Sequence, residues 1–237
     1  MDGRSHRSLP VTSTNSERQL SLDLGKATSH AREDFVVSDC NHVAVAAVES
    51  WPRWPGGKLA LVGPAGTGKT HLARVWAAKV GATTPEFEGG LVPAPTSGAI
   101  LFEDADRRMA DDLLFHMFNM ADAGVSLLVT GRTPPAEWAS RLPDLRSRLK
   151  ALTVATLEPP DDVVLLGVMN KLFSERNIRP TPGVGAYIIR RIERSPQAVQ
   201  DVVRRIDECA SADKREITLA LVRQIFHGDD ETLDREG

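Results

Sequence analysis

Short apolar runs alternate with amphipathic stretches through the middle of the chain. The runs KLALVG (58–63), AILFED (99–104) and VSLLVTG (125–131) are too short for helices and end in glycine or acid, as buried strands do. Apolar residues with helical spacing precede the first run, in NHVAVAAVESW, and separate the others, in HLARVWAAKVGA and MADDLLFHMFNMADAG. Strands that alternate with helices predict an α/β fold in which helices cover both faces of a parallel sheet.

The ends of the chain have different patterns. After LEPPDD (157–162) only helical spacing remains, in VVLLGVMNKLFSERN, VGAYIIRRIE, PQAVQDVVRRIDECAS and TLALVRQIF. Residues 1–33 are rich in Ser, Thr, Arg and Asp, a composition that buries too little surface to order a chain. We therefore expect a flexible tail at 1–33, an α/β base domain at 34–157 and a small all-α lid at 158–237.

Composition narrows the function classes. A hydrophobic fraction of 41% is enough for a core, and a net charge of −3 gives no basic footprint for wrapping a duplex. Cys40 and Cys209 are far apart and lack metal-ligand spacing, which favours a reduced cytoplasmic protein. The start MDGRSHRSLPVTSTN has no apolar segment, so we expect neither secretion nor membrane insertion.

A phosphate-binding loop stands where the first strand meets a helix. GPAGTGKT (63–70) satisfies G-x-x-x-x-G-K-[ST], which predicts that Lys69 reaches the outer phosphates and that Thr70 binds Mg²⁺. The alternative is a glycine-rich turn that merely opens a helix. The residues we expect at the nucleotide are Gly63, Pro64, Ala65, Gly66, Thr67, Gly68, Lys69, Thr70 and His71.

Polar residues follow the next two strands. Glu103 and Asp104 end the second, and we expect Glu103 at the metal and Asp104 beside both the metal and the attacking water. The alternative is a strand that simply ends in solvent. Thr130 ends the third, and either contacts the γ-phosphate or the water or is structural. Arg146 and Arg148, in RLPDLRSRLK, could reach a nucleotide on another subunit, although a solvated basic helix end explains them equally.

Four segments in register resemble one family. GPAGTGKTHL, FHMFN (115–119), LLVTGRTPPAEW and LPDLRSRL are similar to the P-loop, central helix, sensor 1 and arginine-finger segments of the bacterial replication initiator DnaA and its shorter relative Hda. The resemblance covers about residues 34–227, an AAA+ module with its lid. It implies that Arg148 is an arginine finger acting on ATP held by DnaA, with Arg146 as second choice. It also implies that Asn41 lies beside the base, although a helix N-cap explains Asn41 equally.

Within this family the chain is most similar to the Hda type. The interval GGLVPAPTSG (89–98) is shorter than the helical insertion of initiators, and little chain follows IFHG, so we expect neither a filament nor a DNA-reading domain. Hda, bound to the DNA polymerase III β sliding clamp, makes DnaA hydrolyse its ATP. A tail peptide matches the clamp-binding form Gln-Leu-Ser-Leu-x-Leu. Its residues are Gln19, Leu20, Ser21, Leu22, Asp23 and Leu24.

The resemblance also has consequences for partners. It implies DnaA and the clamp as partners, DNA contact only through the clamp, a possible homodimer, and a place at the replisome in the bacterial cytoplasm. Arginines of the predicted lid alternate with acids, which indicates a mixed solvated or docking face rather than a DNA surface. These residues are Arg190, Arg191, Arg194, Arg204 and Arg205, with Glu193, Asp201, Asp207 and Glu208.

Two departures from the family pattern bear on hydrolysis. Glu103 replaces the usual Asp at the metal, and Gln197 stands where the lid usually offers an Arg, which Arg194 replaces only if the helix begins differently. We expect bound ADP or ATP with Mg²⁺ and weak intrinsic ATPase activity. The alternatives are an autonomous ATPase of the clamp-loader or helicase-loader type, or a clamp-tethered adaptor in which the nucleotide is structural.

Overall fold

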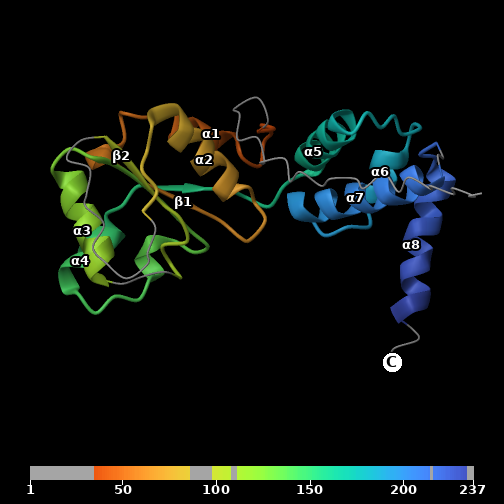
Figure 1. The fold of residues 1–237 in the computed structure, drawn as a ribbon. Helices are drawn as coiled ribbons and strands as arrows, with labels where there is room; N and C mark the ends of the chain where they lie inside the picture. The colour runs from red at the N-terminus through yellow and green to blue at the C-terminus, as the bar shows by residue number, and fades with distance from the viewer. Residues whose placement is uncertain (1–34, 86–97, 108–110, 214–215, 234–237) are drawn as a thin grey trace, which may run out of the picture.

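The computed structural model describes residues 35–85, 98–107, 111–213 and 216–233. Its core is a four-stranded sheet (Figure 1). All pairings are parallel and the strand order is β2-β3-β1-β4, which confirms the predicted parallel sheet. We had not predicted β4, because three residues are too few to show a pattern. The strands are β1 Lys58–Val62, β2 Ala99–Phe102, β3 Ser126–Gly131 and β4 Val154–Thr156.

Helices cover both faces of this sheet (Figure 1). In β1, Leu59 and Leu61 pack with α1 and α2, whereas Ala60 and Val62 pack with α3 and α4. The alternation follows from the strand period of two, which sends successive side chains to opposite faces. The elements of these layers are α1 His42–Glu49, η2 Pro55–Gly57, α2 Lys69–Val80, α3 Asp111–Asp122, η3 Pro135–Glu137 and α4 Pro143–Lys150.

The C-terminal part is helical, as predicted, and has its own core. Buried side chains such as Leu165, Ile188, Val203 and Val222 come from all four of its helices. In Figure 1 these helices lie on the side of the sheet away from α3 and α4. No helix among the described residues is long and apolar enough to cross a membrane. The helices are α5 Asp162–Glu175, α6 Val184–Ile189, α7 Pro196–Asp213 and α8 Leu219–Leu233.

The segment before α1 packs against the junction between the sheet and the helical part. The Glu158 N–H donates to the Cys40 carbonyl over 3.3 Å. A Cβ built on Gly167 of α5 would lie 2.8 Å from a methyl carbon of Val36, so the segment touches the α5 backbone there. The segment before α1 therefore lies against Glu158 and the backbone of α5.

Candidate nucleotide site and arginine finger

The P-loop has the form that an anion site requires. Gly66 has φ +76°, a left-handed conformation that glycine adopts without strain. Helix α2 begins at Lys69, and no side chain of the described residues caps its first N–H groups. Uncapped N–H groups and the helix dipole favour a phosphate at this end of the helix. The loop therefore fits a nucleotide, as its sequence predicts.

Lys69 is buried inside the loop. Its Nζ donates to the Gly63 and Pro64 carbonyls, each over 2.7 Å. Burial lowers the pKa of Lys69, and the nearby charge of Arg132 lowers it further, while Asp104 and Asp106 oppose the shift. Two of the three N–H groups of the ammonium are engaged by loop carbonyls, which leaves one N–H for a phosphate.

The acids after β2 differ in their surroundings. Glu103 accepts from Nη2 of Arg74 on α2 over 3.1 Å, so its carboxylate is held toward α2. The Asp104 N–H donates to the Thr130 hydroxyl over 3.0 Å. Because β3 lies between β1 and β2, Thr130 stands between the ends of the P-loop strand and the acidic strand. Thr130 thus positions the Asp104 backbone; its predicted contact with the γ-phosphate stays a prediction, as do the metal roles of Glu103, Asp104 and Thr70.

Two residues that we had not predicted, Arg132 and Asp106, lie beyond the C-terminal ends of β3 and β2. The Arg132 N–H donates to Asp106 over 2.8 Å, and the other carboxylate oxygen of Asp106 is buried without a partner among the described residues. Both residues lie close enough to Lys69 to shift its pKa. The run EDAD carried a signal for Asp106, but the position of Arg132 depends on Gly131 pairing with Val62 beside the P-loop.

The lid contacts the P-loop through Ser195. A Cβ on Gly66 would lie 2.9 Å from the Ser195 Cβ, and the Ser195 hydroxyl accepts from the Ala198 N–H over 3.1 Å at the start of α7. A Ser before a Pro at a helix start is an N-cap signal that sequence analysis could have used. Ser195 therefore belongs to the candidate site.

Both predicted lid residues make polar contacts within the helical part. Gln197 is exposed and its amide donates to Asp201, one turn along α7, over 3.3 Å. Helix α7 begins at Pro196, so Arg194 precedes it, and Arg194 pairs with Asp162 over 2.7 Å. The role of Gln197 at the nucleotide stays a prediction.

The segment before α1 also lies beside the P-loop. The Phe35 ring meets the His71 ring edge-on at 5.5 Å between centroids and lies beside Gly68. Asn41 is buried and accepts from the Ser38 N–H over 3.0 Å, while its amide donates to the Val36 carbonyl over 2.9 Å. Asn41 therefore holds the conformation of residues 36–41, which follow Phe35. Its predicted contact with the base stays a prediction.

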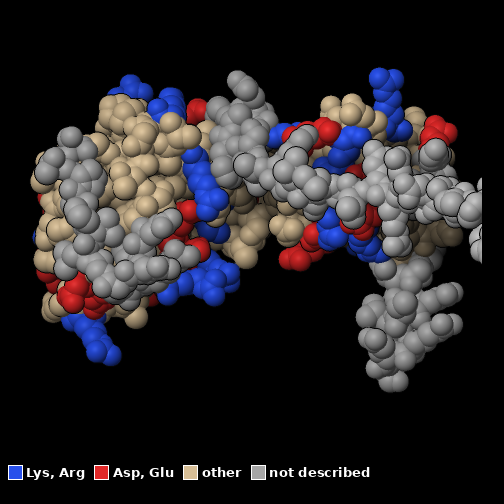
Figure 2. Space-filling view, in the orientation of Figure 1, with Lys and Arg blue, Asp and Glu red and all other residues tan. Residues whose placement is uncertain are grey.

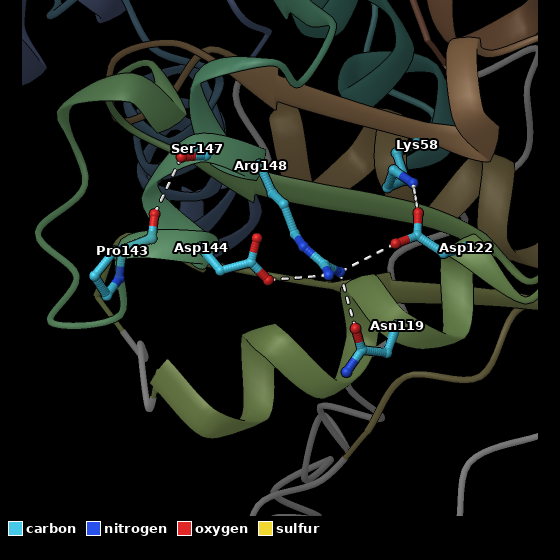
Figure 3. A network of polar contacts seen from close by, with 7 residues as sticks. All are labelled: Lys58, Asn119, Asp122, Pro143, Asp144, Ser147 and Arg148. Atoms are coloured by element: carbon cyan, nitrogen blue, oxygen red, sulfur yellow. Dashed lines mark hydrogen bonds and ion pairs between the residues drawn. The ribbon is translucent and has the colours of Figure 1, made fainter.

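Arg148 lies near the N-terminal end of β1, whereas the P-loop follows its C-terminal end. Lys58 begins β1 and bonds Asp122, and Asp122 in turn accepts from Arg148 over 3.0 Å (Figure 3). The P-loop follows the other end of β1, about 13 Å away at the usual strand rise. Arg146, two positions earlier on α4, is exposed, and its side chain has no hydrogen bond or ion pair within the described part of the chain. Arg148 therefore cannot reach the phosphates of its own P-loop.

Several arginines of the helical part pair with acids, whereas Arg191 lies over the Tyr187 ring at 3.7 Å. Arg204 contacts Asp201 and Glu208 on α7, each over 3.4 Å, and Arg176 pairs with Asp207 over 3.6 Å. Figure 2 shows blue and red side chains intermixed over the helical part. This is the mixed face that the sequence indicates. The predicted clamp peptide, Gln19 to Leu24, and nearly all of 89–98 lie outside the described residues.

The chain is related to DnaA. It is 25% identical over 265 aligned residues to the chromosomal replication initiator protein DnaA of Thermomicrobium roseum, an alignment that covers 97% of this chain and 57% of the initiator. The chain thus spans little more than half the length of that relative. No protein-family model matches the chain.

Solved structures agree on the AAA+ fold. Domain III of Thermotoga maritima DnaA is similar with a TM-score of 0.64 at 17% identity, over 81% of this chain and 93% of that one. AMPPCP-bound DnaA of Aquifex aeolicus gives 0.55 at 16%, over 75% and 64%. The Holliday junction branch migration motor RuvB of T. maritima gives 0.58 at 18%, over 83% and 70%. At these identities the likeness establishes the fold alone.

Proposed function

We propose that this protein is a DnaA-related regulator of the Hda type. Tethered to the sliding clamp by the peptide Gln19 to Leu24, it presents Arg148 to ATP bound by DnaA and stimulates hydrolysis there. The observation that carries the proposal is the distance of Arg148 from its own P-loop, because any triphosphate that this residue meets has to belong to another molecule. The relationship to DnaA supports a DnaA-type partner.

The chemistry asked of Arg148 is electrostatic. As a phosphoryl group leaves ATP, negative charge shifts toward the leaving oxygen, and a guanidinium supplied by another molecule stabilises it. Such fingers are worth about 10³ to 10⁵ in rate where they have been removed or added. A weak hydrolytic site that lacks only this charge would thus become active on contact with Arg148.

We propose that the chain's own P-loop holds ADP or ATP with Mg²⁺. Lys69 would bind the outer phosphates, and Thr70, Glu103 and Asp104 would hold the ion. The ion supplies charge neutralisation and a polarised water when bound. Because Glu103 is engaged by Arg74, we expect this site to bind the nucleotide and to hydrolyse it slowly. We place the regulator in the bacterial cytoplasm, with parts at 1–33, 34–157 and 158–237.

The decisive experiment follows the conversion of ATP to ADP on DnaA in the presence of DNA-loaded clamp. The full chain should accelerate conversion, Arg148→Ala should abolish the acceleration, and removal of residues 1–30 should abolish both clamp association and acceleration. Arg146→Ala, on the same helix, is the matched control and should retain most of the acceleration.

Other outcomes would identify the alternatives. Full acceleration by Arg148→Ala, with clamp binding retained, would indicate an adaptor in which the nucleotide is structural. Rapid ATP turnover by the purified chain alone, in an oligomer that requires Arg148, would indicate an autonomous ATPase. Either result would overturn the proposed function.

A further inference from the structure

The guanidinium of Arg148 contacts three polar side chains, which Figure 3 shows, and also lies over an aromatic ring. Its Nη1 donates to Asn119 over 2.9 Å and to Asp122 over 3.0 Å, and its Nη2 lies 3.0 Å from an oxygen of Asp144. The guanidinium carbon lies 4.9 Å from the centre of the Phe115 ring. Three of these four groups come from α3, within or just after the FHMFN segment.

This arrangement neutralises the charge of Arg148. Asp122 also accepts from Lys58, so two cations and two carboxylates stand together and their charges cancel. An arginine stabilises a phosphate by offering net positive charge and unoccupied N–H groups. Held by Asp122 and Asp144, Arg148 offers little of either.

The enclosure is not needed to hold α3 against α4. Leu114 and Met117 of α3 and Leu145 and Leu149 of α4 are almost fully buried in one apolar cluster, and burial of such side chains dominates helix packing. Phe115 packs against that cluster, but the ion pairs of Arg148 are made by side chains that keep substantial exposure: 28% for Arg148, 52% for Asp122 and 59% for Asp144. Exposed pairs of this kind are weak and reversible.

We propose that Asn119, Asp122 and Asp144 form a latch that withdraws Arg148, and that docking on a triphosphate-bearing partner releases it. The inference rests on the proposed function of Arg148 and adds a resting state to it. The latched fraction cannot contact the partner's phosphates, so the latch lowers the apparent activity by the fraction of molecules that are open. Because the partner's phosphates carry more negative charge than the latch, they compete for the guanidinium once the surfaces meet.

Two surface substitutions open the latch. Asp122→Asn removes one carboxylate and Asn119→Ala removes the neutral acceptor, and both side chains are exposed, so the fold should tolerate the changes. Glu208→Gln, which breaks an exposed Arg204 pair on α7, is the matched control. We expect each latch variant to stimulate DnaA hydrolysis about twofold to fivefold more than the unmodified chain, the range that one exposed pair allows. The control should leave stimulation unchanged.

A second measurement does not depend on DnaA. The rate at which phenylglyoxal modifies Arg148, followed by mass spectrometry on the isolated chain, should be low relative to Arg146 and should rise in both latch variants. An unchanged rate at Arg148 would overturn the latch. A raised rate without increased stimulation would also overturn it as a regulatory device, and reduced stimulation would show that the same contacts position Arg148 for action. If Arg148→Ala still stimulates hydrolysis, the proposed function fails, whatever the modification rates.

Discussion

At the scale of single residues, the ammonium of Lys69 has acceptors in the loop itself and is also predicted to bind a phosphate. The loop carbonyls hold it over 2.7 Å, and burial lowers its pKa. A nucleotide offers charged acceptors, which bind an ammonium more strongly than carbonyls do. The two carbonyl bonds hold Nζ inside the loop, where its third N–H can meet a phosphate.

We predict that Lys69→Ala abolishes stabilisation by nucleotide. With Mg²⁺ and nucleotide at about 100 times its Kd, the unmodified chain should gain about 2.7 kcal/mol. For a chain of this size the gain corresponds to roughly 5–10 °C in Tm. Thermal unfolding with and without nucleotide measures the difference. Lys79→Ala, in the exposed last turn of the same helix, should keep the full shift, and a shift retained by Lys69→Ala would contradict the assigned role.

At the scale of elements, the start of α5 ties the lid to the base. Asp161 is the N-cap and accepts from the Val164 N–H over 2.9 Å. Burial works to raise its pKa, but hydrogen bonds from Val164 and from the Ser38 and Cys40 side chains outweigh burial and lower it. Asp161 thus joins the lid helix to the segment before α1.

The lowered pKa of Asp161 predicts how stability depends on pH. A carboxyl whose pKa falls on folding stabilises the protein above its unfolded pKa of about 3.9, and the contribution is lost as the pH falls through the folded value. Asp161→Ala should cost about 0.5–2 kcal/mol at pH 7, the usual worth of an N-cap. The difference from the unmodified chain should shrink below about pH 4. Urea unfolding at several pH values measures this.

A matched control is available at the other end of α5. Within the described part of the chain, Glu175 makes an exposed pair with Lys171 over 3.6 Å and no other, so Glu175→Ala should change stability little at any pH. A pH-independent loss in Asp161→Ala would show that the cap acts without its charge.

At the scale of the whole molecule, the lid and the base meet at the nucleotide loop. Ser195 of the lid lies against Gly66 of the P-loop, so closing the lid and binding a nucleotide involve the same surface. A Cβ built on Gly66 would lie 2.9 Å from the Ser195 Cβ, so the two segments are in direct contact.

We predict that Gly66→Ala weakens nucleotide binding beyond the cost of backbone strain. Gly81→Ala isolates that cost, because Gly81 also has a positive φ (+67°) but has open space around its Cβ position. Both changes should cost about 1–2 kcal/mol of stability. Only Gly66→Ala should also reduce nucleotide affinity. If separating the P-loop from Ser195 costs a further 1.4 kcal/mol or more of binding free energy, the affinity falls about tenfold or more. Equal affinities in titrations would rule out a role for the Ser195 contact.

The sequence by itself determined the elements and the phosphate loop. Short apolar runs that end in glycine or acid identified three strands, and period-3.6 spacing identified the helices, because both are patterns of neighbouring residues. The P-loop was equally local, since one run of eight residues contains its glycines, Lys69 and Thr70. Strand β4 was not predicted, because Val154–Thr156 forms a strand through its pairing with β1 and has no pattern of its own in the sequence.

Only the tertiary structure decided which side chains meet. Arg146 and Arg148 give the same signal in the sequence, but positions two apart on a helix face different ways, and packing of α4 on α3 turned Arg148 toward Asp122 and left Arg146 exposed. In the same way, the strand order set Thr130 between the P-loop and the acids, and the lid brought Ser195 to Gly66. Such contacts join residues far apart in the chain, so they depend on how the elements pack, which no local pattern records.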